Sequence, residues 1–360
     1  MDRTEIIRWL REMDGERLDA LWHEADRVRH VTVGDAVFLR GLIEISNICS
    51  RDCHYCGIRA GRADLARYRM TAEEILACAR QAIEFGYGTV VLQSGEDYGV
   101  SREWISDIIR RIKALPAPWG DSGALAVTLS LGERPDDDLL AWKAAGADRY
   151  LLRFETSNRP LYDRIHPPLA GRHSDRLAIL QRLSEIGYEV GSGVMIGIPG
   201  QTYEDLADDI EWFRRLDLDM IGVGPFLPHP GTPLGRGESV AVLPAGQQAP
   251  NDELTTYKVV AVTRLVCPAA NIPSTTALAT VNREAGRELG LMRGANIVMP
   301  NLTPPEYRRR YEIYPDKACL HETAGYCQGC IRGQILSLGR TVGIGRGDSP
   351  NRLRRTQPLA

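Results

Sequence analysis

Residues 49–56 read Cys49-Ser50-Arg51-Asp52-Cys53-His54-Tyr55-Cys56, a C-x3-C-x2-C spacing with an aromatic residue directly before the last cysteine. A structural zinc site normally has four protein ligands, often two C-x2-C pairs or their histidine variants, and no such partner pair lies nearby. Soft thiolates select iron–sulfur chemistry. Three of them can hold a [4Fe-4S] cubane and leave its fourth iron open to a ligand. The spacing therefore favours a cluster at Cys49, Cys53 and Cys56 over an incomplete zinc site or three reduced thiols.

The composition sets the broad class. A chain of 360 residues is long for one average domain, but an α/β barrel of this size is ordinary. The net charge of −3 gives no long-range attraction to nucleic acid or anionic membranes. No apolar run approaches the ~20 residues that span a bilayer, and the charged amino terminus lacks a signal-peptide core. Six of the eight cysteines fall in two tight clusters, which is typical of metal binding in a reducing compartment. We therefore expect a cytoplasmic protein that binds neither nucleic acid nor a membrane.

Short apolar stretches alternate with amphipathic helical patterns along the chain. Eight short strands that alternate with helices predict a parallel sheet. Their number predicts closure into a (β/α)8 TIM barrel, with a six-strand partial barrel as the alternative. The strands are expected at 37–45, 89–93, 125–131, 150–154, 190–198, 220–223, 272–277 and 296–299, and the main helices near 102–114, 136–145, 175–187, 202–216, 253–266 and 284–293.

Three regions follow from this pattern. Residues 1–35 are expected to form an amphipathic helical cap, residues 36–313 the barrel, and residues 314–360 a cysteine-containing extension with an accessory metal site. The extension ends in a Gly-rich basic stretch after about residue 341, which predicts a flexible tail. Within the barrel, Thr71 and Glu74 form an S/T-x-x-E capping box that predicts a helix start.

In such a barrel the working residues lie on loops at the carboxyl ends of the strands. Arg153 and Glu155 share parity on the expected fourth strand, so both are expected to face the same side. An unpaired charge inside a barrel would be expensive, and a charged ligand would remove that cost. An internal ion pair between Arg153 and Glu155 is the alternative.

A second cysteine group, Cys319-x7-Cys327-x2-Cys330, lies near the carboxyl terminus. Three thiolates within twelve residues fit a metal better than chance. An accessory iron–sulfur cluster is the preferred interpretation. Zinc is the alternative, because His321 could supply a fourth ligand.

The cysteine loop with its aromatic residue resembles the radical S-adenosylmethionine (SAM) superfamily, in which the amino and carboxylate groups of SAM chelate the open iron. Ser94-Gly95-Glu96, after the second expected strand, resembles the superfamily's Gly-Gly-Glu element, which holds the SAM amino group.

A narrower resemblance covers roughly residues 36–335. The sequence is similar there to the [FeFe]-hydrogenase maturase family HydE, except that Phe154 stands where that family is expected to have histidine. The strings that carry the similarity include Tyr68-Arg69-Met70-Thr71, Val91-Leu92-Gln93-Ser94-Gly95-Glu96-Asp97, Thr128-Leu129-Ser130-Leu131-Gly132-Glu133, Gly294-Ala295-Asn296 and Val298-Met299-Pro300-Asn301.

The resemblance implies a role for each matching residue. The cysteines of the first loop would ligate the catalytic cluster, those near the carboxyl terminus would hold an accessory cluster, and Arg153 would act in catalysis as well as in substrate binding. The residues implied to bind SAM are Tyr55, Gln93, Glu96, Thr128, Glu155, Arg176, Pro225, Tyr311 and Ile313. Those implied to line an anion-binding substrate cavity are Arg149, Arg153, Thr275, Thr276 and Tyr314.

The resemblance also implies a function. Such an enzyme reductively cleaves SAM to a 5′-deoxyadenosyl radical and acts on an iron complex carrying CO, cyanide and cysteine, in assembly of the diiron subcluster of the hydrogenase H-cluster. Its implied partners are sister maturases, a scaffold protein and a reductant such as ferredoxin or flavodoxin. The alternatives are a radical SAM mutase of an amino acid, similar to methylornithine synthase, a biotin-synthase-like sulfur insertase, and a non-catalytic iron–sulfur carrier.

Overall fold

The computed structural model describes residues 1–118, 124–238, 243–244, 246–320 and 322–356. All pairings between its named strands are parallel, in the order β6-β5-β4-β3-β2-β1-β7, with β8 beside the start of β1. The strands are β1 (Ala36–Ser46), β2 (Thr89–Ser94), β3 (Ala126–Ser130), β4 (Arg149–Leu151), β5 (Glu189–Ile196), β6 (Met220–Pro225), β7 (Ile297–Val298) and β8 (Thr341–Val342).

The ring closes through residues 271–273, which lie between β6 and β7. Asn271 forms a parallel bridge with Met220 of β6, and Pro273 forms one with Ile297 of β7. These residues occupy the position of the seventh strand, so the predicted TIM-barrel fold is confirmed. The predicted strand at 272–277 is much shorter than expected. Proline has no N–H to donate to a ladder, and Thr275 already caps the next helix by accepting a hydrogen bond from the Leu278 N–H.

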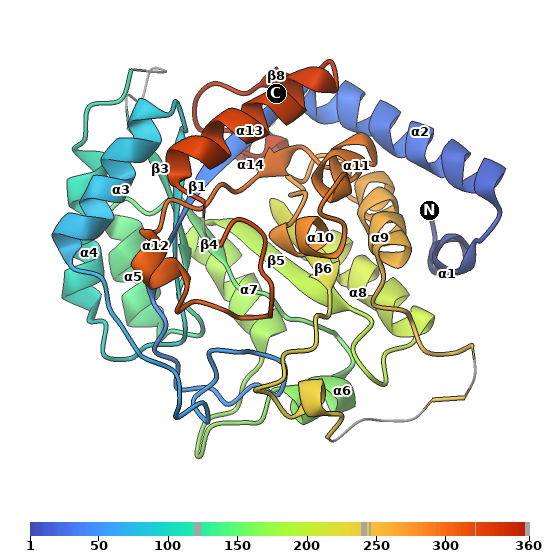
Figure 1. Ribbon diagram of the computed structural model, residues 1–360, viewed down its shortest axis with the longest axis horizontal. Coiled ribbons are helices and arrows are strands. Elements are labelled where there is room, and N and C mark those ends of the chain that lie inside the picture. The colour runs from blue at the N-terminus through green and yellow to red at the C-terminus, as the bar shows by residue number, and fades with distance from the viewer. Residues whose placement is uncertain (119–123, 239–242, 245, 321, 357–360) are drawn as a thin grey trace.

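Helices surround the sheet (Figure 1). They are α1 (Arg3–Arg11), α2 (Gly15–Val33), α3 (Ala72–Glu84), α4 (Arg102–Lys113), α5 (Asp136–Ala144), α6 (Arg159–Ile165), α7 (Arg176–Ile186), α8 (Tyr203–Arg215), α9 (Glu253–Val266), α10 (Thr276–Val281), α11 (Gly286–Met292), α12 (Pro305–Arg308), α13 (Ala324–Ser337) and α14 (Pro350–Thr356), with a 3-10 turn, η1, at Leu234–Arg236. Among the described residues, no helix is long and apolar enough to cross a membrane.

The helix α3 illustrates how local sequence sets these elements. Both halves of the predicted capping box form: the Thr71 side chain accepts from the Glu74 N–H, and the Glu74 carboxylate accepts from the Thr71 N–H. Ile75, Ala79 and Ala82 then lie fully buried on the face toward the sheet. The amino-terminal helices join the same outer layer, because α2 packs along α9 and α1 packs against α8 and α9.

The carboxyl-terminal segment contradicts the prediction of a flexible tail for residues 341–356. The strand β8 pairs with β1, and Gly343 and Gly347 lie so close to the Phe38 ring that a Cβ on either would be 2.5–2.6 Å from it. Asp348 forms an ion pair with Arg149 at the start of β4. The glycines that suggested fraying instead permit close packing at the amino-terminal end of the barrel. Residues 357–360 lie outside the described residues.

Candidate active site

The cysteine loop follows directly from β1 at the carboxyl end of the strands. In Figure 1 it is the blue loop at the opposite end of the barrel from β8 and α14. Cys53 is buried, Cys49 and Cys56 are partly buried, and all three thiols are free. Burial raises the pKa of Cys56 to about 12, with a further contribution from Cys49, and burial followed by the charges of Cys56 and Cys49 raises the pKa of Cys53. The three sulfurs are therefore near enough to influence one another electrostatically.

The spacing of these sulfurs fits a cluster rather than one ion. Within the described residues, the one group of three ligand atoms found within 4.8 Å of one another is at Cys319, Glu322 and Cys327. Cys49, Cys53 and Cys56 do not converge that closely. Thiolates around a cubane bind different iron atoms and must be spread over its corners, so three thiols that do not meet at one point are compatible with a [4Fe-4S] cluster.

Backbone and phenol groups lie close to these sulfurs. The Glu96 N–H donates to the Cys49 Sγ at 3.3 Å, and the Arg51 backbone is near enough to the same sulfur to act against the rise in its pKa that burial causes. The Tyr55 side chain acts in the same direction on the pKa of Cys53, and the Ile58 backbone on that of Cys56. Such donors favour the thiolate form of cysteine, which is the form that binds iron.

Two glycines allow other segments to approach the loop. A Cβ on Gly57 would lie 2.1 Å from the Glu312 carbonyl oxygen, and one on Gly95 would lie 2.3 Å from that of Ile48. The Gly57 N–H donates to the Ile313 carbonyl at 2.9 Å. These contacts bring the 311–313 segment and the tip of β2 against the cysteines.

Three of the predicted ligand-binding residues have buried polar atoms without a hydrogen-bond partner in the described part of the chain. They are the Thr128 Oγ1, the Arg153 Nε and the Glu155 Oε2. Buried polar groups are normally satisfied in proteins, and the Glu155 Oε2 is compensated by the Arg153 ion pair, so the Thr128 Oγ1 and the Arg153 Nε are the atoms left for a polar ligand. Glu155 also has φ of +63°, a strained conformation that is common at functional sites.

Arg153 and Glu155 do face each other, but not because of strand alternation. The strand β4 ends at Leu151, and the left-handed backbone of Glu155 sets its direction. The Arg153 Nη2 lies 3.2 Å from the Glu155 Oε2 as an ion pair and also donates to the Val194 carbonyl. The internal pair predicted as the alternative is therefore present, while the Nε of Arg153 is left for another group.

Arg176, predicted to bind SAM, lies in a buried polar network. Its Nε donates to Glu133 at 2.9 Å, its Nη1 to the Arg153 carbonyl at 2.6 Å, and its Nη2 bonds the His166 Nε2 at 2.7 Å. Burial, with the charge of Arg176, lowers the pKa of His166 to about 2, so this ring is a neutral acceptor. A guanidinium has five N–H groups, and these bonds leave donors on Arg176 for a carboxylate.

Glu96 does not offer its carboxylate to the site, contrary to the prediction from the Gly-Gly-Glu resemblance. The carboxylate accepts from the Arg51 Nε at 2.8 Å, the Tyr98 hydroxyl at 2.7 Å and the Glu133 N–H at 3.0 Å. Glu96 is buried and its oxygens are satisfied. Arg51 is not among the predicted site residues. Its position inside the cysteine loop was the available signal that it contacts the residues that hold this loop in place, Glu96 and Glu133.

Arg149 lies at the wrong end of the barrel for a substrate ligand. It opens β4, is fully buried, and forms ion pairs with Glu189 and Asp348. It also donates to the Thr89 hydroxyl at 2.9 Å. Its charge is compensated by these partners, so we remove it from the predicted substrate cavity.

The other predicted residues lie at the carboxyl end of the barrel. The Gln93 Nε2 donates to the Tyr311 hydroxyl at 3.3 Å, Pro225 ends β6, and Thr275 and Thr276 begin α10. Burial is the main effect on Tyr314 and raises the pKa of its hydroxyl. The charge of Arg153 acts in the opposite direction, which places Tyr314 near Arg153.

The amino-acid sequence matches known proteins along most of its length. A model of the Radical SAM superfamily matches residues 43–213. The chain is 46% identical over 325 residues to the [FeFe] hydrogenase maturase subunit HydE of Thermotoga maritima, a match that covers 90% of this chain and 87% of that protein. The chain belongs to the HydE family of radical SAM enzymes.

Two more distant matches are one of sequence and one of structure. The 3-methylornithine synthase of Methanosarcina acetivorans is 28% identical over 79% of this chain and 74% of its own. The crystal structure of methylornithine synthase (PylB) superposes with a TM-score of 0.74 at 24% identity, over 95% of this chain and 94% of that one, and supports the barrel fold. Membership of the HydE family implies a [4Fe-4S] cluster and SAM as cofactors.

The second cysteine group of this HydE-family chain is only partly assembled as predicted. Cys319 and Cys327 come together with Glu322, whereas Cys330 is exposed and outside this group. The thiol of Cys327 donates to Cys319 and, with Arg287 nearby, lowers the pKa of Cys319 to about 6. The buried Arg308 donates to the carbonyls of Cys319 and Glu322 at 2.9 and 2.7 Å, which holds the turn in place. His321 lies outside the described residues.

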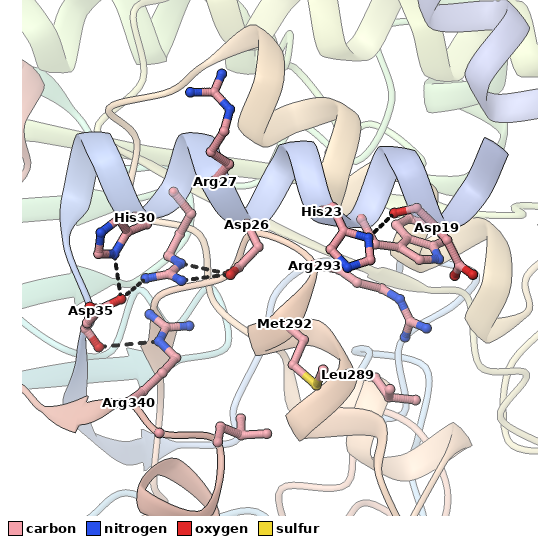
Figure 2. A pocket seen from close by; sticks show the side chains of 14 residues that line it. Asp19, His23, Asp26, Arg27, His30, Asp35, Leu289, Met292, Arg293 and Arg340 are labelled. Carbon is pink, nitrogen blue, oxygen red and sulfur yellow. Dashed lines mark hydrogen bonds and ion pairs between the residues drawn. The ribbon is translucent and has the colours of Figure 1, made fainter. Parts of the chain in front are cut away.

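A surface cavity of about 650 Å³ lies away from the predicted site. Figure 2 shows side chains of α2 facing those of α11 and Arg340 across it. None of the predicted ligand-binding residues lines this cavity. Its arginines Arg29 and Arg340 are largely engaged, by Asp26, Asp35 and backbone carbonyls. We assign it no part in the chemistry.

Proposed function

We propose that this enzyme acts in assembly of the diiron subcluster of [FeFe]-hydrogenase. The observation that carries the proposal is the 46% identity to a HydE maturase over 90% of the chain, against 28% to 3-methylornithine synthase. The amino-acid mutase is therefore the weaker candidate. A non-catalytic iron–sulfur carrier would need no SAM site, and the buried Thr128 Oγ1 and Arg153 Nε, which have no partner among the described residues, favour a ligand there.

In this proposal Cys49, Cys53 and Cys56 hold the cluster. Cluster and SAM together supply one-electron reductive chemistry when bound. Tyr55, Gln93, Thr128, Glu155, Arg176, Pro225, Tyr311 and Ile313 surround SAM. The chain's own part is to orient the ligands and to exclude water, because reactive species survive only in a closed and well-positioned site. Burial of Cys53, Glu155 and Tyr311 suits that task.

The proposed substrate is an iron complex that carries CO, cyanide and cysteine and is supplied by a sister maturase. Such a complex is anionic, and a guanidinium binds anions through strong charge-assisted hydrogen bonds. Arg153 supports this proposal because its side chain is 35% exposed and its Nε has no partner among the described residues. Thr275, Thr276 and Tyr314 would complete the cavity. A scaffold protein would accept the product, and ferredoxin or flavodoxin would supply electrons.

Hydrogenase activation tests this function. Anaerobic mixtures with the sister maturases and apo-hydrogenase are expected to yield active enzyme when this protein is present and background activity when it is omitted. SAM cleavage is measured in the same samples. Cleavage with no effect on activation would favour a mutase acting on another substrate, and absence of cleavage in cluster-loaded protein would favour a carrier.

We further propose an accessory metal site at the second cysteine group, formed by Cys319 and Cys327 with Cys330 or Glu322 as the third ligand. Changing all three cysteines to alanine is expected to lower the bound iron while SAM cleavage stays within about twofold of the parent, because this group is separate from the first cysteine loop. Metal analysis and 5′-deoxyadenosine release measure the two effects. Unchanged metal content would contradict the site, and lost maturation in a folded variant would give it a role in electron supply or partner binding.

A further inference from the structure

We propose that the ion pair between Arg51 and Glu96 sets the reduction potential of the cluster, by holding the N–H···S hydrogen bond that Glu96 donates to Cys49. Arg51 is thus a positioning residue for the reaction. This inference rests on the cluster-binding part of the proposed function and does not depend on the substrate.

The Cys49 sulfur receives a hydrogen bond from another segment of the chain. The donor is the Glu96 N–H in the loop after β2, at 3.3 Å, whereas the sulfur belongs to the cysteine loop. This hydrogen bond keeps its geometry only if the two segments keep fixed positions relative to each other.

The Arg51 side chain joins the two segments. It is 3% exposed, and it pairs with Glu96 through Nε at 2.8 Å and with Glu133 through Nη2 at 2.7 Å. The cysteine loop and the loop after β2 are therefore linked twice, once through the hydrogen bond to the Cys49 sulfur and once through the Arg51–Glu96 ion pair. Tyr98 and the Glu133 N–H fix the same Glu96 carboxylate from the other side.

The Glu96 carboxylate is not available to a ligand, because it is buried and both its oxygens accept hydrogen bonds. Arg51 directs Nε at Glu96 and Nη2 at Glu133, while its buried Nη1 has no hydrogen-bond partner among the described residues. The Arg51–Glu96 pair therefore contributes through the sulfur donor that it holds. The reduced cluster carries one more negative charge than the oxidised one, so N–H donors at a ligand sulfur stabilise the reduced form more and raise the potential. Loosened donors must lower it.

The test is a redox titration of reconstituted protein without SAM, followed by EPR of the reduced cluster. Arg51→Lys keeps the charge but loses the fork that bridges Glu96 and Glu133. We expect the ratio of reduced to oxidised cluster at a fixed potential to fall about tenfold, which for one electron is a midpoint about 59 mV more negative. The matched control is Arg59→Lys. Arg59 lies in the segment just after the cysteine loop and pairs with Asp52 rather than with Glu96.

A midpoint in Arg51→Lys equal to that of the parent and the control would overturn the inference. If Arg51→Lys loads no cluster, the same titration of Tyr98→Phe tests the inference instead. This change keeps the ring and removes the hydroxyl that donates to Glu96. A more negative midpoint there supports the inference, and an unchanged one overturns it. Parent protein that loads no cluster would instead refute the proposed function.

Discussion

Replacing Cys53 with alanine is expected to abolish both cluster binding and SAM cleavage. Cys53 is the middle one of three thiols, and the cluster cannot be held by the remaining two while an iron stays open for SAM. The loss should reach background for 5′-deoxyadenosine release and for the iron–sulfur absorption of anaerobically reconstituted protein. Cys49→Ala and Cys56→Ala should behave alike.

Cys78→Ala is the matched control for this prediction. Cys78 is as buried as Cys53, at 5% against 8% exposed, but lies within α3 and donates only to the Leu302 carbonyl. Its replacement removes the same atom and should cost about 1 kcal/mol of stability without loss of the cluster. SAM cleavage in Cys53→Ala at the parent rate would remove the cysteine loop from the active site.

The barrel could be predicted because its signals are local. Apolar runs of strand length, helical periodicity and the Thr71–Glu74 capping box each lie within one short window, and the structure forms α3 as that box predicts. The seventh strand was misjudged for a local reason that the sequence also contained. Pro273 cannot donate to a ladder, and Thr275 caps a helix, so only bridges at Asn271 and Pro273 remain.

The cysteines of the site could be predicted for the same reason, since their spacing alone specifies a metal centre. The arginine–carboxylate pairs around the site and at the other end of the barrel could not be predicted. Arg51 meets Glu96 across 45 positions, and Arg149 meets Asp348 across 199. A pair formed over such separations depends on the completed fold, and a charged residue in a strand looks the same in sequence whether a ligand or a distant carboxylate compensates it. This is why Arg149 was wrongly placed in the substrate cavity and the tail was wrongly expected to be flexible.

At Arg153, experiment can distinguish a charge that a ligand compensates from a charge that a carboxylate of the chain compensates. Its ion pair with Glu155 is real, but the Arg153 side chain is 35% exposed, so solvent screens the pair. Breaking a fully buried pair costs about 3–5 kcal/mol, and this one should cost less. A purely structural role therefore predicts a modest loss of stability together with weaker SAM binding at Glu155.

A substrate role predicts a different pattern for Arg153→Lys. Lysine retains the charge and can still pair with Glu155, but the three N–H groups of its single ammonium cannot reproduce the planar fork that places Nη2 at Glu155 and leaves Nε for an anion. One charge-assisted hydrogen bond contributes about 1.5–3 kcal/mol, so hydrogenase maturation should fall about 10- to 100-fold. SAM binding and its slow cleavage without substrate should stay near the parent values.

The control for this prediction is Arg159→Lys, at the start of α6. That arginine pairs with Asp163 on the surface, where both side chains are 45% exposed, and should tolerate the change. Maturation at the parent rate in a folded Arg153→Lys variant would remove Arg153 from the substrate site. A joint loss of thermal stability and SAM affinity would assign it to the ion pair alone. Only a selective loss of maturation fits an arginine whose free Nε binds the substrate anion.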